Sequence, residues 1–249
     1  MIAIISDIHG NLEALTAVLG KIDELGCEQV VCLGDVVGYG PDPVDCLDVV
    51  RARCDTCLMG NHDFAVMYEP YNFNTSAEAA CFWTRRQLQA EPEPEARKAR
   101  WKFLGELPVR HVADTFLAVH ASPRRPVNEY IFPDDIYTNP AKFGSIFERV
   151  HTISFCGHTH VPGVFLEGPD FYSPDELDGK YPITDEKAVI NVGSVGQPRD
   201  RDPRASFVTL SSDAVQFYRV PYDVQTTVKK VEREPALDNF LGSRLLDGR

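Results

Sequence analysis

Short apolar runs alternate with amphipathic stretches along the first sixty residues of the chain. The runs at residues 1–6, 29–33 and 56–59 predict buried strands. Residues 11–26 place leucine, valine and isoleucine at helical spacing, and residues 43–53 begin with a proline suited to a first helical turn. The pattern predicts a β-α-β-α-β arrangement with parallel strands.

The pattern changes after residue 63. Residues 64–108 are rich in Arg, Glu, Gln and Ala, and we expect two or three helices there, broken near residues 91–94. These helices would either cap a functional site or form only a packing layer. Further strands are predicted at 115–119, 152–156, 161–166, 188–192, 206–210 and 214–220, with a helix near 139–149.

Two segments predict less regular structure. Residues 167–187 are polar and rich in Asp, Glu and Pro, which predicts a mobile excursion. The tail from Thr226 predicts a helix that then frays. Because the chain shows no internal repeat and no linker between two cores, we expect one domain across residues 1–249.

Composition narrows the classes of function. The hydrophobic content of 43% and charged content of 25% are ordinary for a soluble globular protein, and the formal net charge is −12. That charge argues against stable binding of nucleic acid or of an anionic membrane. It does not exclude a phosphate substrate, because bound metal cations invert the local field. With no signal-peptide pattern and no apolar run near 20 residues, we expect a cytoplasmic protein whose oligomeric state is open.

The seven cysteines are scattered, and we expect reduced thiols. Cys54-Asp55-Thr56-Cys57 is a C-x-x-C sequence, which raises the question of a redox or zinc site. The pair leads into a predicted strand rather than starting a helix, and no second pair is present to complete a zinc site. We therefore interpret Cys54 and Cys57 as packed thiols.

Five short segments place carboxylate, amide and imidazole groups just past predicted strand ends. In open α/β sheets this edge is where ligands bind. In chain order they are Asp7-Ile8-His9, Gly34-Asp35, Gly60-Asn61-His62-Asp63, His120 and Gly157-His158-Thr159-His160. Their nitrogen and oxygen donors suffice for two divalent metals, with one carboxylate to bridge them. His111 and His151 lack a neighbouring glycine or carboxylate, so we interpret them as structural.

These motifs, in this order, resemble the calcineurin-like metallophosphoesterase superfamily. Residues 38–41, Gly-Tyr-Gly-Pro, and 191–199, Asn-Val-Gly-Ser-Val-Gly-Gln-Pro-Arg, resemble its compact prokaryotic phosphodiesterase branch. The resemblance implies a four-layer α-β-β-α sandwich of two mixed sheets flanked by helices. It also implies roles for the motif residues. Asp7, His9 and His160 would hold the first metal, Asn61, His120 and His158 the second, and Asp35 would bridge them, while His62 would stand near the leaving group, supported by Asp63.

Two arginines are candidates for binding the substrate phosphate. Arg124 follows His120 in the loop Ser122-Pro123-Arg124-Arg125-Pro126, and a guanidinium there suits a non-bridging phosphate oxygen. Arg199 belongs to a second basic run whose interleaved aspartates also suit surface ion pairs. For both residues a solvated surface position stays the alternative.

The combined hypothesis is a metal-dependent phosphoesterase that hydrolyses esters by in-line attack of a water activated by two metals. We expect phosphodiesters rather than monoesters, with nucleotide-derived esters among the candidate substrates. A protein phosphatase or a dinucleoside polyphosphate hydrolase is the alternative on the same site, and a catalytically idle metal-binding scaffold is the third. Ligands of nitrogen and oxygen without thiolate fit Mn, Fe, Zn, Co or Ni.

Overall fold

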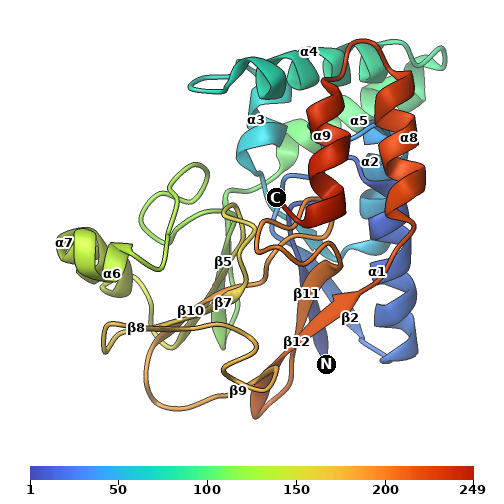
Figure 1. Ribbon diagram of the computed structural model, residues 1–249. Helices are drawn as coiled ribbons and strands as arrows, with labels where there is room; N and C mark the ends of the chain where they lie inside the picture. The colour runs from blue at the N-terminus through green and yellow to red at the C-terminus, as the bar shows by residue number, and fades with distance from the viewer.

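Two six-stranded sheets form the centre of the computed structural model, which describes residues 1–249 (Figure 1). The strands of the first sheet, in spatial order, are β3 (Thr56–Cys57), β2 (Gln29–Cys32), β1 (Ile2–Ile5), β11 (Ala205–Leu210), β12 (Ala214–Val220) and β9 (Lys180–Pro182). The three N-terminal strands run parallel, and β11 joins β1 antiparallel. The predicted parallel β-α-β-α-β arrangement is confirmed.

The second sheet is also mixed. Its strands, in spatial order, are β4 (Arg110–Val112), β5 (Phe116–Val119), β6 (Ile153–Cys156), β10 (Ala188–Asn191), β7 (Gly163–Leu166) and β8 (Asp170–Tyr172). Strands β5, β6 and β10 run parallel, whereas β4, β7 and β8 pair antiparallel.

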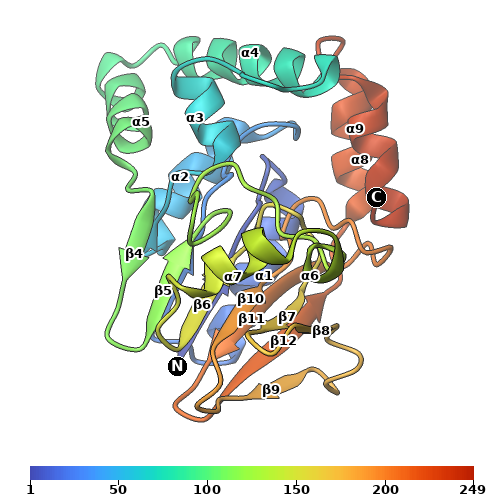
Figure 2. The same cartoon turned by 90° about the vertical axis from the view of Figure 1, so that its left-hand side faces the viewer.

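Helices surround the two sheets. They are α1 (Leu12–Glu24), α2 (Pro43–Arg53), α3 (Asn61–Met67), α4 (Thr75–Gln89), α5 (Pro94–Glu106), α6 (Asp135–Thr138), α7 (Pro140–Phe147), α8 (Val224–Arg233) and α9 (Asn239–Ser243), with a final 3₁₀ turn, η1 (Arg244–Asp247). Figure 2 shows α4 across the top of the molecule, between α5 on one side and α8 and α9 on the other.

The side chains of β1 show how the layers form. Because strand side chains alternate between faces, Ala3 and Ile5 join the core with α1, while Ile4 joins the core between the sheets. Phe155 and Ile190 of the second sheet belong to that same inter-sheet core. On the far side of the second sheet, the core includes aromatic residues of α7. The four-layer α-β-β-α sandwich is therefore as predicted.

Helix α1 forms where the sequence pattern predicts it. The side chain of Asn11 accepts a hydrogen bond from the Ala14 N–H at 3.1 Å, which satisfies one of the free donors of the first turn. Leu15, Val18 and Ile22 lie on the buried face. Asn11 also donates to the carbonyl of Gly196 at 2.9 Å, so the cap ties the helix start to a loop at the site.

Three segments depart from the sequence predictions. Residues 167–187 hold the edge strands β8 and β9 and are not a plain excursion, and β4 was not predicted. These edge strands have three residues each and carry few apolar side chains, so they lack a clear period-two pattern. The tail does not fray, because α9 and η1 bury Leu241 and Leu245 at 3% and 4% exposure.

All seven cysteines are free thiols, and five of them, including Cys57, are buried. Cys54 is only partly buried. No helix of the structure is both long and apolar enough to cross a membrane.

Candidate metal centre

Seven side chains converge at the strand ends where the two sheets meet. They come from the loops after β1, β2, β5 and β6 and from the start of α3. Six of them are at most 4% exposed, and the asparagine is partly exposed. They are Asp7, His9, Asp35, Asn61, His120, His158 and His160, all of the residues that the sequence nominated as ligands. The structure brings the complete set together.

The first group of donors surrounds one side of Asp35. The Nε2 atom of His160 lies 3.2 Å from Asp7 Oδ1 and 3.2 Å from His9 Nε2. The Nε2 atom of His9 lies 3.6 Å from Asp35 Oδ2. These atoms are within the spacing that a shared cation requires.

The second group of donors lies on the other side of Asp35 Oδ2. The Nε2 atom of His120 is 3.1 Å from Asn61 Oδ1 and 3.2 Å from His158 Nδ1. It is also 3.4 Å from Asp35 Oδ2. One carboxylate oxygen therefore belongs to both groups.

The two carboxylates are oriented by backbone donors. The N–H of His62 donates to Asp35 Oδ1 at 2.7 Å, which leaves Oδ2 directed at the histidines. The N–H of His158 donates to Asp7 Oδ2 at 2.9 Å. The remaining oxygen, Asp7 Oδ1, is buried without a hydrogen-bond partner. An ionised oxygen left in this state is costly unless a cation compensates it.

The His160 ring is held in one tautomer. Its Nδ1 lies 2.6 Å from the carbonyl oxygen of Gln197, and only an N–H can satisfy that contact. The lone pair is therefore on Nε2, which faces Asp7 and His9. This is the arrangement of a metal-binding histidine with an outer carbonyl partner.

The motif glycines make room for the carboxylates. A Cβ atom at Gly60 would lie 2.0 Å from Asp35 Oδ1, and one at Gly157 would lie 2.3 Å from Asp7 Oδ2. Any larger residue would displace a nominated ligand. The Gly-Asn and Gly-His spacing of the sequence therefore reflects close approach of backbone and carboxylate.

Five of the seven nominated ligands have a left-handed backbone, namely Asp7, His9, Asp35, His158 and His160, with φ between 50° and 66°. This conformation costs a non-glycine residue on the order of 1–3 kcal/mol and gathers at functional sites. It turns the backbone sharply after each strand and directs the side chain inward.

Electrostatics also favour a cation. Burial alone would raise the pKa of Asp35, but the surrounding imidazoles, His120 foremost, hold it well below its ordinary value. Burial favours neutral His120, but the carboxylates around it, Asp35 foremost and then Asp7 and Asp63, together outweigh burial and raise the pKa of His120 to about 9. A proton on His120 thus offsets the carboxylate charge, and a divalent ion would replace it.

The donor set fits divalent metals. It offers imidazole nitrogens, carboxylate oxygens and one amide oxygen, without thiolate. The arrangement also allows a further grouping, because a ring nitrogen of His62 lies near the ligand atoms of His9 and Asp35.

His62 is enclosed by aromatic rings. Its ring centroid lies 4.3 Å from that of Tyr39, 4.6 Å from Phe73 and 4.8 Å from His9. Its Nδ1 is 3.8 Å from the Cys81 sulfur. Burial lowers the pKa of His62 to about 4, and the Asp35 charge only partly opposes this.

Asp63 does not support His62 as the resemblance implied. Its two oxygens accept backbone N–H groups from Asp35 at 2.7 Å, Val36 at 3.0 Å, Val37 at 3.3 Å and Gly60 at 3.0 Å. Burial raises the pKa of Asp63 to about 7. All four hydrogen bonds are donated by backbone N–H groups to Asp63 oxygens, so they favour the ionised carboxylate. Asp63 therefore fixes the loop that presents Asp35 and acts on His62 only indirectly.

The two candidate arginines differ in whether a carboxylate pairs with their charge. Arg124 forms an ion pair with Glu129, with Nη2 at 2.5 Å from Oε1, so its charge is already neutralised. Arg199 forms no ion pair and donates to the Gln197 side-chain oxygen at 2.7 Å. Its guanidinium carbon lies 5.9 Å from the centre of the Tyr39 ring. Arg199 is the better placed of the two to meet an anion.

The end of β10 and the loop after it brace the loops that carry the candidate metal ligands, a role that the sequence did not reveal. The hydroxyl of Ser194 donates to the carbonyl of Asp7 at 2.8 Å. The amide of Asn191 donates to the Gly157 carbonyl at 2.7 Å. The resemblance marked residues 191–199, but nothing in their composition indicates that they brace the metal-ligand loops.

Two mixed sheets between helical layers, with histidine, aspartate and asparagine donors at the strand ends, define a metallophosphoesterase. The sequence model described as the Calcineurin-like phosphoesterase superfamily domain matches residues 1–214. The chain belongs to this family, whose members hydrolyse phosphate esters and typically bind divalent metals.

The similarity to known relatives covers the whole chain. The chain is 35% identical over 259 residues to the uncharacterized protein MJ0912 of Methanocaldococcus jannaschii, covering 100% of this chain and 98% of that protein. The crystal structure of a metallophosphoesterase from Sphaerobacter thermophilus is similar, with a TM-score of 0.83, 36% identity, and coverage of 100% and 98%. The fold is also that of the hypothetical protein PH1004 from Pyrococcus horikoshii OT3, with a TM-score of 0.77, 20% identity, and coverage of 100% and 99%.

The contacts of Asp63 predict a loss of stability on substitution. In Asp63→Asn an NH₂ group would face backbone donors, so the free energy of unfolding should fall by roughly 1–3 kcal/mol. Asp55→Asn is the matched control, because Asp55 is exposed and accepts one backbone bond, from Val30 at 2.8 Å. Urea unfolding of metal-free protein measures both. Equal stability of Asp63→Asn and wild type would show that Asp63 does not anchor the loop.

Proposed function

We propose that the protein is a phosphodiesterase in which seven side chains hold two divalent metals and Asp35 bridges them. The observation that carries this proposal is the position of Asp35 Oδ2, 3.6 Å from His9 Nε2 and 3.4 Å from His120 Nε2. An oxygen that faces two separate groups of nitrogen and oxygen donors suits a bridging ligand.

Asp7, His9 and His160 would hold one ion and Asn61, His120 and His158 the other. When bound, such ions lower the pKa of a coordinated water and offset the charge of the phosphate. The chain fixes the donors in advance, through backbone bonds to both carboxylates and the carbonyl bond to His160.

Arg199 would orient the phosphate. Its guanidinium lacks a carboxylate partner and lies 5.9 Å from the centre of the Tyr39 ring, and its backbone N–H donates to the His160 carbonyl at 3.2 Å. Since Arg124 is paired with Glu129, Arg199 is the candidate arginine left to meet the phosphate. The pocket that adjoins Asn61, His62 and His158 leaves room for a second ester group, which favours a diester.

His62 would donate a proton to the leaving oxygen. Its ring borders both the metal-ligand cluster and a neighbouring pocket. Because its pKa is about 4, the negative charge of a bound phosphate must raise it before His62 can act as an acid. This requirement ties proton donation to the presence of substrate.

The proposed function predicts metal-dependent hydrolysis with a preference for diesters. Protein stripped with a chelator should be inactive, and Mn²⁺ should restore turnover of methyl p-nitrophenyl phosphate at higher kcat/KM than of p-nitrophenyl phosphate. Release of nitrophenolate measures both rates. A higher kcat/KM for the monoester would contradict the diester assignment, and turnover by the stripped protein would contradict the metal requirement.

The acid role of His62 predicts a dependence on the leaving group. His62→Gln should retain its metal and lose about 10²–10⁴-fold in kcat on alkyl diesters, but much less on nitrophenyl diesters, whose leaving group needs no proton. Measuring kcat across a series of leaving-group pKa values separates this role from simple orientation of the phosphate. Loss of metal from His62→Gln would instead make His62 a ligand.

A further inference from the structure

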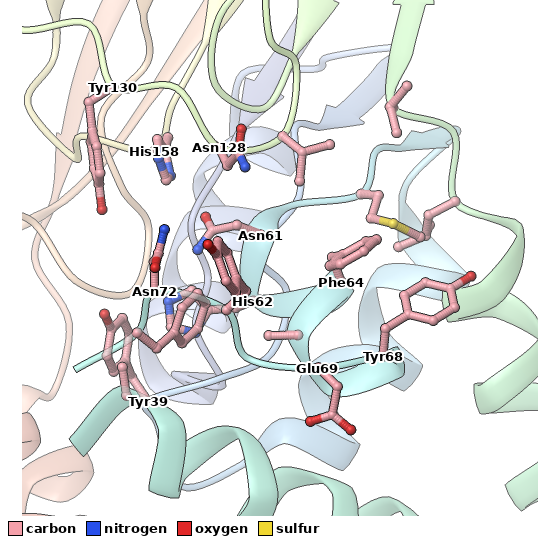
Figure 3. Close-up of a pocket in the computed structure, with 18 of the residues that line it drawn as sticks. Tyr39, Asn61, His62, Phe64, Tyr68, Glu69, Asn72, Asn128, Tyr130 and His158 are labelled. Atoms are coloured by element: carbon pink, nitrogen blue, oxygen red, sulfur yellow. The ribbon is translucent and has the colours of Figure 1, made fainter. Parts of the chain in front are cut away.

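A cavity of about 820 Å³ opens beside the metal centre. Its wall includes Asn61 and His158, two of the nominated ligands, together with His62. Figure 3 shows these three side chains in the middle of the wall, with Tyr39 and Tyr130 on one side. The volume lies within the range of about 300–1,000 Å³ that small-molecule sites occupy. A phosphate held at the metals would therefore direct one of its ester groups into this cavity.

Exposed aromatic rings line the side away from the metals. Phe64 is 41% exposed and Tyr68 is 52% exposed, and their ring centroids lie 4.7 Å apart. Figure 3 shows both rings on the cavity wall, on the opposite side from Tyr130. Adjacent rings left exposed in this way offer a surface for stacking with a planar group.

The lining is nearly free of charge. Glu69 is its only carboxylate, and it contains no lysine or arginine. A second phosphate or a carboxylate in this cavity would meet no cation and one like charge, which is unfavourable. This composition argues against a polyphosphate chain or an acidic peptide as the group that enters.

Two amides supply polar contacts along the wall. The side chains of Asn72 and Asn128 line the cavity, and neither forms a hydrogen bond within the chain. Each offers two donors and an acceptor. They suit a planar group that carries nitrogen or oxygen at its edge, such as a heteroaromatic ring.

We propose that this cavity binds an uncharged aromatic ester group of the substrate, of the aryl or nucleoside class, by stacking on Phe64 and Tyr68. The assignment rests on the proposed function, because the metals must hold the phosphate that positions this group. It deepens that function by naming the class of organic group that the enzyme prefers.

Phosphonates test the assignment without turnover, since their P–C bond is not an ester. Isothermal titration of the Mn²⁺-loaded protein would compare methylphosphonate, phenylphosphonate, cyclohexylphosphonate and 4-carboxyphenylphosphonate. We expect phenylphosphonate to bind at least about tenfold more tightly than methylphosphonate, on the scale of base–aromatic stacking. The cyclohexyl compound should show a smaller gain, because its ring is not planar, and the added carboxylate should weaken binding.

Substitutions on the cavity wall test which rings bind the aromatic group. Phe64→Leu and Tyr68→Leu keep apolar bulk but remove a ring, and each should reduce the ratio of phenylphosphonate to methylphosphonate affinity by about threefold or more. Tyr137→Leu is the control, because Tyr137 is 78% exposed on α6 and does not line the cavity. It should leave the ratio unchanged.

Equal affinity of the protein for phenylphosphonate and methylphosphonate would overturn the proposal, as would a ratio that neither cavity variant changes. Tighter binding of the carboxylated ring would contradict the uncharged class. If the chain bound these phosphonates as expected but hydrolysed no ester, the aromatic site would stand and the proposed function would fail. The two failures are therefore distinguishable.

Discussion

One carboxylate oxygen, Asp35 Oδ2, lies between two groups of buried nitrogen and oxygen donors, and the site is arranged around it. His9 Nε2 and His120 Nε2 approach it from opposite groups, at 3.6 Å and 3.4 Å. Gly60 leaves the space that the carboxylate occupies, and the His62 N–H fixes its other oxygen. Two ionised carboxylates packed among imidazoles, where almost no water reaches, require a compensating positive charge. A site built to hold cations explains why the chain buries so many polar groups here.

Directing these groups inward is costly, and the surrounding structure compensates for it. Five nominated ligands hold a left-handed backbone, each at a cost on the order of 1–3 kcal/mol. Backbone bonds between neighbouring loops, such as Asp7 N–H to the Gly34 carbonyl at 3.0 Å, oppose that cost. Asp63 secures the Asp35 loop by accepting four hydrogen bonds from backbone N–H groups. Ser194 and Asn191 secure the loops of Asp7 and Gly157 by donating to their carbonyl groups. The fold therefore stores strain at the strand ends and is braced around them.

Much of this could be predicted from the sequence, for physical reasons. The buried strands and α1 follow from apolar periodicity, and the nominated ligands stand out because parallel strands bring their carboxyl ends to one edge. The contacts of Asp63 could not be predicted, because a carboxylate beside a histidine looks the same in sequence whether it meets an imidazole or backbone amides. The packing of Leu241 in one cluster with Trp83 could not be predicted, because it joins segments that are distant in the sequence. The cavity wall brings Phe64 and Tyr68 at the end of α3 together with Asn128, and no local sequence pattern encodes that arrangement.

The number of metal ions bound per chain tests the shared-oxygen geometry most directly. Protein stripped of metal, loaded with excess Mn²⁺ and freed of unbound ions by gel filtration would be analysed for Mn and for protein in the same sample. The account predicts two ions per chain, because each donor group around Asp35 Oδ2 supplies a complete set of side chains. A value that stays at one or below at saturating Mn²⁺ would contradict it.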